Sequence, residues 1–143
     1  MPAARSDSFA ASETYLFAAG HRRSVRLVHR HGPPQDPEKR VLAADVDLAE
    51  STLAQARGLM FRRSIPDDYA LVFPFDRSRS RTLHMLFVPF PIDVLWLSDG
   101  EVTAKKRLAP FVGIGRGTAD VVVELPAGAA EAVAVGDEVV LVE

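Results

Sequence analysis

The sequence predicts an all-β fold, mainly antiparallel and arranged as a β-sandwich or a barrel-like sheet, with one short helix near residues 51–60. Two observations support this prediction. Short runs rich in β-branched and aromatic residues recur along the chain, and turn-like links separate them. Only one segment has helical periodicity, which is too few helices for the crossovers of a parallel sheet. A length of 143 residues suits one domain, which we place at residues 23–143 after a loosely structured segment at 1–22.

The strands are predicted where apolar residues alternate with polar ones or form short β-branched runs. The expected strands cover residues 24–30, 41–48, 70–75, 82–88, 92–98, 101–106, 119–125 and 138–142. Asp99 and Gly100, between two of them, predict a two-residue hairpin, because a type I′ turn needs positive φ at both positions. The glycine-rich segment 113–117 is predicted to be a flexible loop; the alternative is a loop whose backbone N–H groups hold an anion, although a strand follows it where a phosphate loop needs a helix.

The helix is predicted from two features of residues 51–60. Residues 52–55 fit a capping box, and the apolar residues Leu53, Ala56 and Met60 fall on one face. We therefore expect one short helix between the second and third strands.

The composition excludes several classes of function. There is no cysteine, so disulfides, thiolate metal sites and thiol nucleophiles are excluded. The formal net charge of -2 gives no reason to expect a nucleic-acid partner. The longest apolar stretch, 85–97, is interrupted by two prolines and an aspartate, so no membrane span is expected. We recognise no export signal, which favours a cytoplasmic location.

Asp93 and His84 are the most informative polar residues, because each interrupts an apolar strand. A buried carboxylate must be paired or hydrogen-bonded. Asp93 therefore either accepts backbone N–H groups at the proline-rich bend 89–91 and fixes the strand entry, or it serves a functional site. His84 is either a base or metal ligand, or a partly buried structural histidine.

His84, Asp93 and Glu124 together offer one imidazole and two carboxylates, which would suit a metal-assisted or acid-base hydrolase. Their spacing does not show that they meet. No nucleophile elbow, metalloprotease helix, phosphate loop or dinucleotide-binding fingerprint is present, so enzyme activity stays open and no cofactor is implied. His29 and His31 share a face of the first strand, outside the predicted core, and are a weaker metal-binding alternative.

Arg77, Arg79 and Arg81 alternate with serines, so their side chains would share one side of an extended chain. Such a row either grips a phosphate or acidic ligand, or forms a charged edge that prevents sheets from aggregating. No aromatic residues are interleaved with them, as stacking on bases would require.

Five segments occur in the same order as in a known family. They read Ala-Arg-Gly-Leu-Met-Phe-Arg at 56–62, Leu-Val-Phe-Pro-Phe at 71–75, Pro-Ile-Asp at 91–93, Glu-Leu-Pro-Ala-Gly at 124–128 and Gly-Asp at 136–137. On these segments the chain, from residue 45 onward, resembles domain-of-unknown-function family 192. The resemblance implies an all-β, sandwich-like fold and no established activity, and many relatives are exported.

One segment departs from the family pattern. Where the family usually has Trp-Met-Lys-Asn-Thr, this chain has Leu-His-Met-Leu-Phe at 83–87, which puts in doubt any site that depends on the Lys-Asn-Thr group. The departure, together with the arginine-rich composition, resembles a branch of the family found in salt-loving archaea.

The family segments also place charged residues in apolar surroundings, where an arginine-carboxylate pair would satisfy them. We hypothesise that Arg57 pairs with Asp93 or Glu124, and that this polar cluster lines a shallow pocket. The apolar side chains expected beside the pocket are Met60, Met85 and Trp96.

These residues support three functions. The first is a small binding or accessory domain whose pocket takes a small molecule or a segment of a protein partner. The second is the hydrolase built on His84, Asp93 and Glu124. The third is a protein-interaction module that offers a strand edge or the 77–81 segment to a partner.

Overall fold

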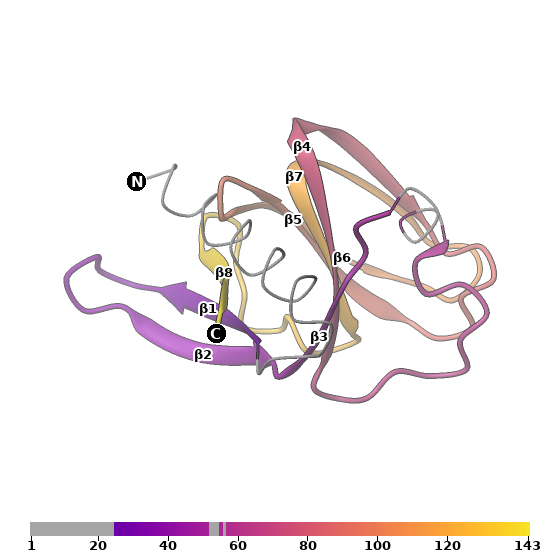
Figure 1. The fold of residues 1–143 in the computed structure, drawn as a ribbon, viewed down its shortest axis with the longest axis horizontal. Helices are drawn as coiled ribbons and strands as arrows, with labels where there is room; N and C mark the ends of the chain where they lie inside the picture. Colours follow the sequence, from indigo (N-terminus) through magenta and orange to yellow (C-terminus); the bar gives the residue numbers. More distant parts are fainter. Residues whose placement is uncertain (1–24, 52–54, 56) are drawn as a thin grey trace.

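The structure is a computed structural model that describes residues 25–51, 55 and 57–143. Its strands are β1 (Arg26–His31), β2 (Glu38–Ala43), β3 (Asp45–Leu48), β4 (Tyr69–His84), β5 (Ile92–Ser98), β6 (Glu101–Leu108), β7 (Ile114–Pro126) and β8 (Glu138–Val142). They form one eight-stranded sheet in the order β2-β1-β8-β6-β5-β7-β4-β3 (Figure 1). Every neighbouring pair is antiparallel except β3 and β4. The predicted all-β, mainly antiparallel fold is confirmed.

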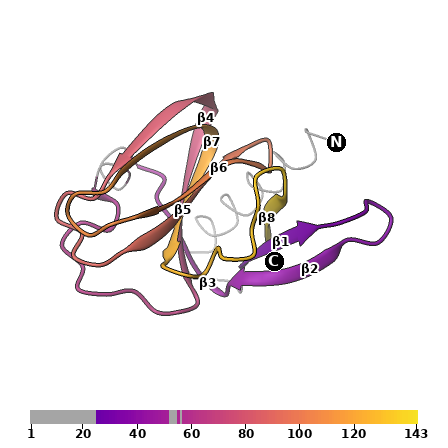
Figure 2. The same cartoon turned by 180° about the vertical axis from the view of Figure 1, so that it is seen from behind.

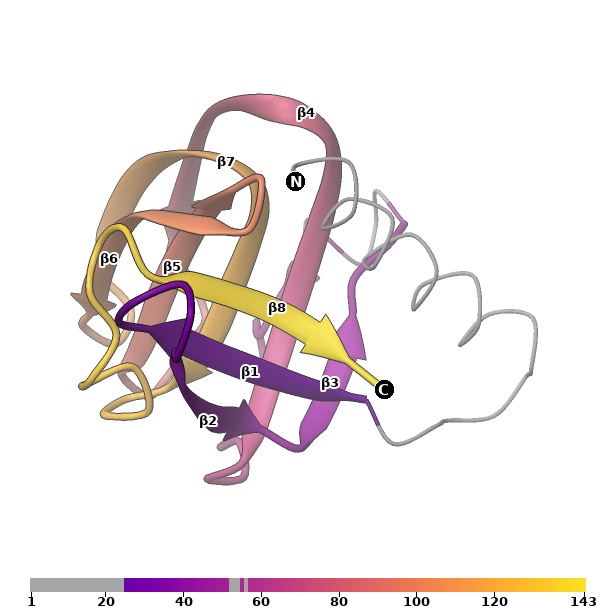
Figure 3. The same ribbon diagram turned by 90° about the vertical axis from the view of Figure 1, so that its left-hand side faces the viewer.

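The sheet curls around one of its faces (Figure 3). Leu42 of edge strand β2 and Val46 of the opposite edge strand β3 belong to the same buried cluster as Leu95 of central strand β5. This inner core draws side chains from both edges, so the sheet is barrel-like. It is not closed, because β2 and β3 lie at the two ends of the strand order.

The outer face of the sheet carries a second buried cluster. Side chains alternate along a strand, so Val94 and Trp96 point away from Leu95 and into this outer core. Leu59, from the segment between β3 and β4, is buried in the same cluster. The outer core therefore joins the sheet to residues 57–62, which belong to the first of the five family segments.

The hairpin predicted at Asp99 and Gly100 is confirmed. These residues have φ of 55° and 83°, and they connect β5 to β6 where Ser98 pairs with Glu101. Both positive φ values are those that a type I′ turn requires.

Two of the predicted strand boundaries are wrong. The strand expected at 41–48 is broken at Ala44, whose N–H donates to the Asp68 carbonyl (3.0 Å), and β3 then runs parallel to β4. The strands expected at 70–75 and 82–88 belong to one long strand, β4. Its polar middle still pairs with β7, with a register shift between Pro74 and Arg79.

The flexible loop predicted at 113–117 is also wrong, because β7 begins at Ile114. Gly115 and Gly117 lie against Trp96, and a Cβ at Gly117 would be 2.5 Å from Trp96 Cγ. These glycines make space for an aromatic ring, whereas the sequence pattern indicated a loop.

Most of the predicted helix near 51–60 cannot be compared, because residues 52–54 and 56 lie outside the described residues, as does the segment 1–22. Gln55 and Arg57 are helical, and the chain turns from residue 58. No helix in the described part of the chain is long and apolar enough to cross a bilayer.

The expectation that His29 lies outside the core is wrong. Its side chain is only 1% exposed, and its Nε2 lies 2.7 Å from Asp137 Oδ2. His29 pairs with Val139 across β1 and β8, and the carboxylate of Asp137, which directly precedes β8, binds Nε2, whereas the buried Nδ1 has no partner among the described residues.

Candidate functional site

Residues 57–62 form a tight turn on the outer face of the sheet, and the buried side chain of Leu59 anchors it there. Gly58 has a φ of +51°. A Cβ at this position would lie 3.5 Å from Phe73 Cζ and 3.7 Å from Glu124 Oε1. Glycine therefore supplies both the left-handed backbone and the close approach of the turn to the Glu124 carboxyl group.

Glu124 lies in β7 and its carboxyl group points into the outer core. The residue is only 4% exposed, and Oε1 has no hydrogen-bond partner among the described residues. Burial raises the pKa of Glu124 from 4.5 to about 8, and the positive charge of Arg62 opposes this only in part. At neutral pH the carboxyl group therefore holds its proton.

A cavity of ≈ 210 Å³, here called the inner cavity, opens beside Glu124. Arg57, Met60 and His84 also line it, so four residues predicted for the pocket border the same space. His84 is exposed, and its Nδ1 accepts a hydrogen bond from the Leu86 N–H (3.2 Å). The cavity thus combines a protonated carboxyl group with an imidazole and a guanidinium group.

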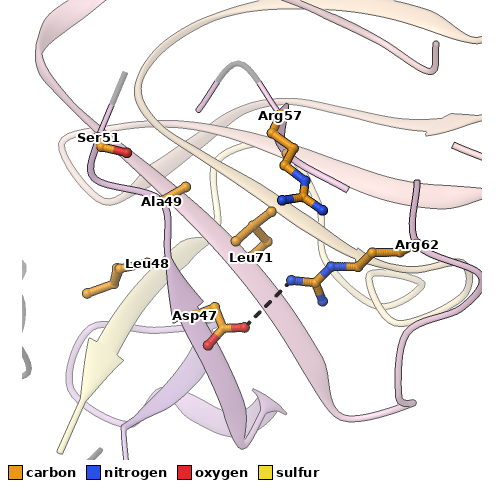
Figure 4. Close-up of a pocket in the computed structure, with 8 residues that line it drawn as sticks. Asp47, Leu48, Ala49, Ser51, Arg57, Arg62 and Leu71 are labelled. Atoms are coloured by element: carbon orange, nitrogen blue, oxygen red, sulfur yellow. Dashed lines mark ion pairs between the residues drawn. The ribbon is translucent and has the colours of Figure 1, made fainter. Parts of the chain in front are cut away.

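A larger groove of ≈ 590 Å³, here called the outer groove, also borders this turn. Arg57 and Gly58 line both spaces. In the outer groove the guanidinium groups of Arg57 and Arg62 point toward the same space beside Leu71 (Figure 4). The groove therefore presents two cations on an apolar floor.

The two guanidinium groups differ in their partners. Arg62 Nη2 lies 4.0 Å from Asp47 Oδ2, and its guanidinium carbon lies 5.1 Å from the centre of the Tyr69 ring. The Tyr69 hydroxyl donates to the same Asp47 oxygen (2.9 Å). Within the described ranges the guanidinium group of Arg57 makes no hydrogen bond or ion pair, and the residue is exposed. Arg57 is thus a cation available to a ligand.

Asp93 is held by a different set of partners. Its Oδ1 accepts from Arg107 Nε (2.8 Å), and its Oδ2 accepts from the N–H groups of Gly128 (3.0 Å) and Ala130 (3.1 Å). Backbone N–H donors satisfy this carboxylate, as the structural interpretation of Asp93 predicts. They come from the turn after β7 rather than from the bend at 89–91.

Asp93 and Glu124 point to opposite faces of the sheet. Asp93 pairs with Leu125, which faces the inner core, whereas Glu124 pairs with Val94, which faces the outer core. The hypothesis that Arg57 pairs with Asp93 is therefore corrected, because the sheet lies between them.

The same geometry separates the three residues of the hydrolase hypothesis. His84 and Glu124 border the inner cavity, but Asp93 does not. In the described part of the chain, no three histidine, aspartate or glutamate side chains gather where they could hold a metal ion. The proposed hydrolase site is not assembled.

Met85 and Trp96, the other apolar residues expected beside the pocket, are each only 1% exposed. Both are buried in the outer core and neither lines either space. Trp96 Nε1 donates to the Arg81 carbonyl (2.9 Å), which satisfies its buried N–H. These residues support the floor of the site from within the core.

The arginine row lies inside β4. Arg81 donates through Nη2 to the Arg77 carbonyl (2.8 Å) and through Nε to the Ala119 carbonyl (3.3 Å). Its guanidinium carbon also lies 3.9 Å from the centre of the Phe75 ring. Arg81 is therefore committed to contacts within the sheet, which leaves Arg77 and Arg79 as the exposed members of the row.

Sequence reasoning missed Asp47, Arg62 and Tyr69. Arg62 ends a family segment, and Asp47 is a polar position of an alternating strand. The parallel pairing of Asp47 with Leu71 places that carboxylate at the groove, and this pairing has no local sequence signal.

Comparison with known proteins places the chain in a family. The sequence model of the family DUF192, described as "Uncharacterized ACR", matches residues 35–141. A curated "UPF0127 protein" from Thermococcus sibiricus is 32% identical over 106 residues, which cover 70% of this chain and 68% of that protein.

Two solved structures have a similar fold. A protein from Sinorhizobium meliloti 1021, described as a "putative transcription regulator", matches with a TM-score of 0.66 and 24% identity, over 80% of this chain and 92% of that one. A protein of unknown function from Novosphingobium aromaticivorans matches with a TM-score of 0.65 and 23% identity, over 80% and 84% of the two chains. At these identities the likeness concerns the fold alone.

Proposed function

This chain belongs to the DUF192 family, and from that premise we propose that it is a small binding domain that holds a small organic anion at the turn 57–62. The observation that carries the proposal is the exposed Arg57 guanidinium group, which has no partner among the described residues and shares the outer groove with Arg62. The anion would be a carboxylate or a phosphate.

The charges that line the outer groove favour an anion. The lining residues include two guanidinium groups and one carboxylate, that of Asp47. Guanidinium groups bind carboxylates and phosphates through paired, charge-assisted hydrogen bonds. Leu48, Ala49 and Leu71 give the groove the apolar surface that is typical of small-molecule sites.

Glu124 supports the same ligand class because it is protonated. An ionised carboxylate would repel an anion, whereas a neutral carboxylic acid can donate a hydrogen bond to it. Glu124 lines the inner cavity, and Gly58 lines both spaces, where a Cβ on it would lie 3.7 Å from Glu124 Oε1. We therefore assign Glu124 as a donor that contacts one oxygen of the ligand.

The test is a thermal-shift titration with inorganic phosphate and with succinate at pH 7. Ligand at about a hundred times its dissociation constant should raise the melting temperature by about 5–10 °C. Arg57→Gln should abolish the shift. Arg40→Gln, an exposed arginine of β2 outside both spaces, is the matched control and should keep it.

Two further variants sharpen the test. Affinity should fall as pH rises through about 8, where Glu124 ionises, and Glu124→Gln should remove this fall because an amide keeps a donor. Replacement of Arg77, Arg79 and Arg81 by serine should leave the shift intact. An anion-induced shift that survives in Arg57→Gln and disappears in the serine variant would move the site to β4 and refute the proposal.

A further inference from the structure

Three loops meet at the end of the molecule opposite the β1–β2 hairpin (Figures 1 and 2). They comprise residues 57–66, 85–91 and 109–113, and the last of these loops leads into β7 at Ile114. Backbone hydrogen bonds join them: the Phe61 N–H donates to the Phe87 carbonyl (2.9 Å), and the Phe111 N–H donates to the Val88 carbonyl (3.0 Å). The Phe61 and Phe87 rings also stack with centroids 5.0 Å apart. The loops thus form one continuous surface.

Large apolar side chains project from these loops into solvent. They are Phe61, Leu86, Phe87, Phe111, Val112 and Ile114, here called the aromatic tip. Their exposed fractions run from 49% for Phe87 to 81% for Val112. None of them lines the inner cavity or the outer groove. Contiguous exposed apolar surface of this kind marks an interaction site.

The backbone of the aromatic tip is strained where its phenylalanines lie. Phe61, Phe87 and Phe111 have φ of 69°, 60° and 64°, and Asp99 is the only other non-glycine residue with positive φ in the described part of the chain. The left-handed region is unfavourable for a phenylalanine. Because each ring is about half exposed or more, burial within this chain compensates little for the strain. Such strain is typical of binding surfaces.

The charged residues within the segments that form the aromatic tip have one sign. Segments 57–66, 84–92 and 109–117 contain Arg57, Arg62, Arg63 and Arg116 and no aspartate or glutamate. The whole chain has more acidic residues, 19, than basic ones, 17. The Lys106 ammonium also lies at this end, where it donates to the Ile114 carbonyl (2.8 Å). The loops that carry the apolar tip therefore contain cations and no acidic residue.

We infer that the aromatic tip docks on the surface of a bilayer that contains anionic lipids. The phenylalanine rings and Val112 would enter the boundary between headgroups and acyl chains, while Arg63 and Arg116 contact the lipid phosphates. Side chains on three separate loops fit a fluid interface better than a peptide, which binds in a groove or along a strand edge. The cationic flank matches an anionic surface.

The test is flotation of the full chain with vesicles of phosphatidylcholine alone or mixed with phosphatidylglycerol. The protein should float with the mixed vesicles, less with the neutral ones, and less again in high salt. The double variant Phe111→Asn with Val112→Ser should lower the partition coefficient about tenfold or more. Asparagine tolerates positive φ, so this variant keeps the fold.

Charge and control variants separate the two contributions. Arg63→Gln and Arg116→Gln should each lower binding to the mixed vesicles about fivefold and leave binding to the neutral ones unchanged. Val41→Ser, which removes an exposed apolar side chain on β2, should have no effect. Absence of flotation with either vesicle overturns the inference. A dimer in sedimentation that the double variant dissociates would also overturn it and assign the tip to self-association.

Discussion

The buried carboxyl group of Glu124 should make the protein less stable as the pH rises. In the unfolded chain the group ionises near pH 4.5, whereas in the folded chain it keeps its proton up to about pH 8. Between these values the folded state holds a proton that the unfolded state has lost, so the free energy of unfolding falls with pH. The slope is about 1.4 kcal/mol per pH unit.

The total effect is large compared with the stability of a domain of this size. Over the interval from 4.5 to about 8 the loss is on the order of 4–5 kcal/mol. The group is almost completely buried, so solvent does not screen this cost. The partial compensation by Arg62 is already contained in the raised pKa.

The assay is urea unfolding of the wild type and of Glu124→Gln at each pH from 3 to 9. The amide has nearly the same shape and does not titrate. The difference in unfolding free energy should therefore be nearly constant below about pH 4 and should grow in favour of the variant up to pH 8. Other titrating groups, including Asp137, cancel in this difference. Parallel pH profiles for the two proteins would refute the assignment of a protonated, buried Glu124.

Three further predictions concern the core and its polar anchors. Asp93→Asn should lower the unfolding free energy by about 2 kcal/mol in urea titrations, because an amide cannot accept all three of the present hydrogen bonds as a carboxylate does. Gly117→Ala should cost about 1–3 kcal/mol and change the emission of Trp96, the only tryptophan, because the new Cβ meets its ring. Burial raises the pKa of Asp137, but hydrogen bonds from the Ala134 N–H and from His29 outweigh this and lower it. The carboxylate therefore stabilises the folded state above about pH 4, and this contribution is lost as the pH falls. Asp137→Asn should therefore cost about 1 kcal/mol at pH 7 and nothing at pH 2, measured by thermal unfolding.

The elements predicted best are those whose sequence pattern is local. Strand β5 has the predicted bounds, because an apolar run interrupted only by Asp93, between Pro91 and the Asp99-Gly100 turn, leaves little freedom. Strand β4 was divided in the prediction because the serine-arginine repeat at 77–81 carries no apolar signal. Its backbone is nevertheless paired, Arg79 with Ala119 and Arg81 with Gly117, since the hydrogen bonds of a strand do not depend on its side chains.

The candidate site was predictable in part for a similar reason. The family segments named Arg57 and Glu124, and both border the inner cavity together with His84. Asp93 was grouped with them because it too is a charge in apolar surroundings. The face of the sheet to which the Asp93 side chain points depends on the register between β5 and β7, in which Asp93 lies opposite Leu125. These strands are not consecutive, so no turn in the sequence fixes that register.

The turn 57–62 contributes to both proposed surfaces, and this makes the two proposals separable by experiment. Arg57 and Arg62 point into the outer groove, whereas Phe61, between them in the same turn, belongs to the aromatic tip. Phe61→Asn suits the positive φ at that position, and it should weaken vesicle binding while it leaves the anion-induced thermal shift intact. Arg57→Gln should abolish the thermal shift. It should weaken vesicle binding by no more than the removal of any one cation of the tip. If each variant removed both properties, the turn would have lost its conformation, and a loss of the Phe61–Phe87 backbone hydrogen bond would appear in hydrogen exchange. If the two losses separate as expected, a membrane-bound chain would hold its anion close to the headgroup layer.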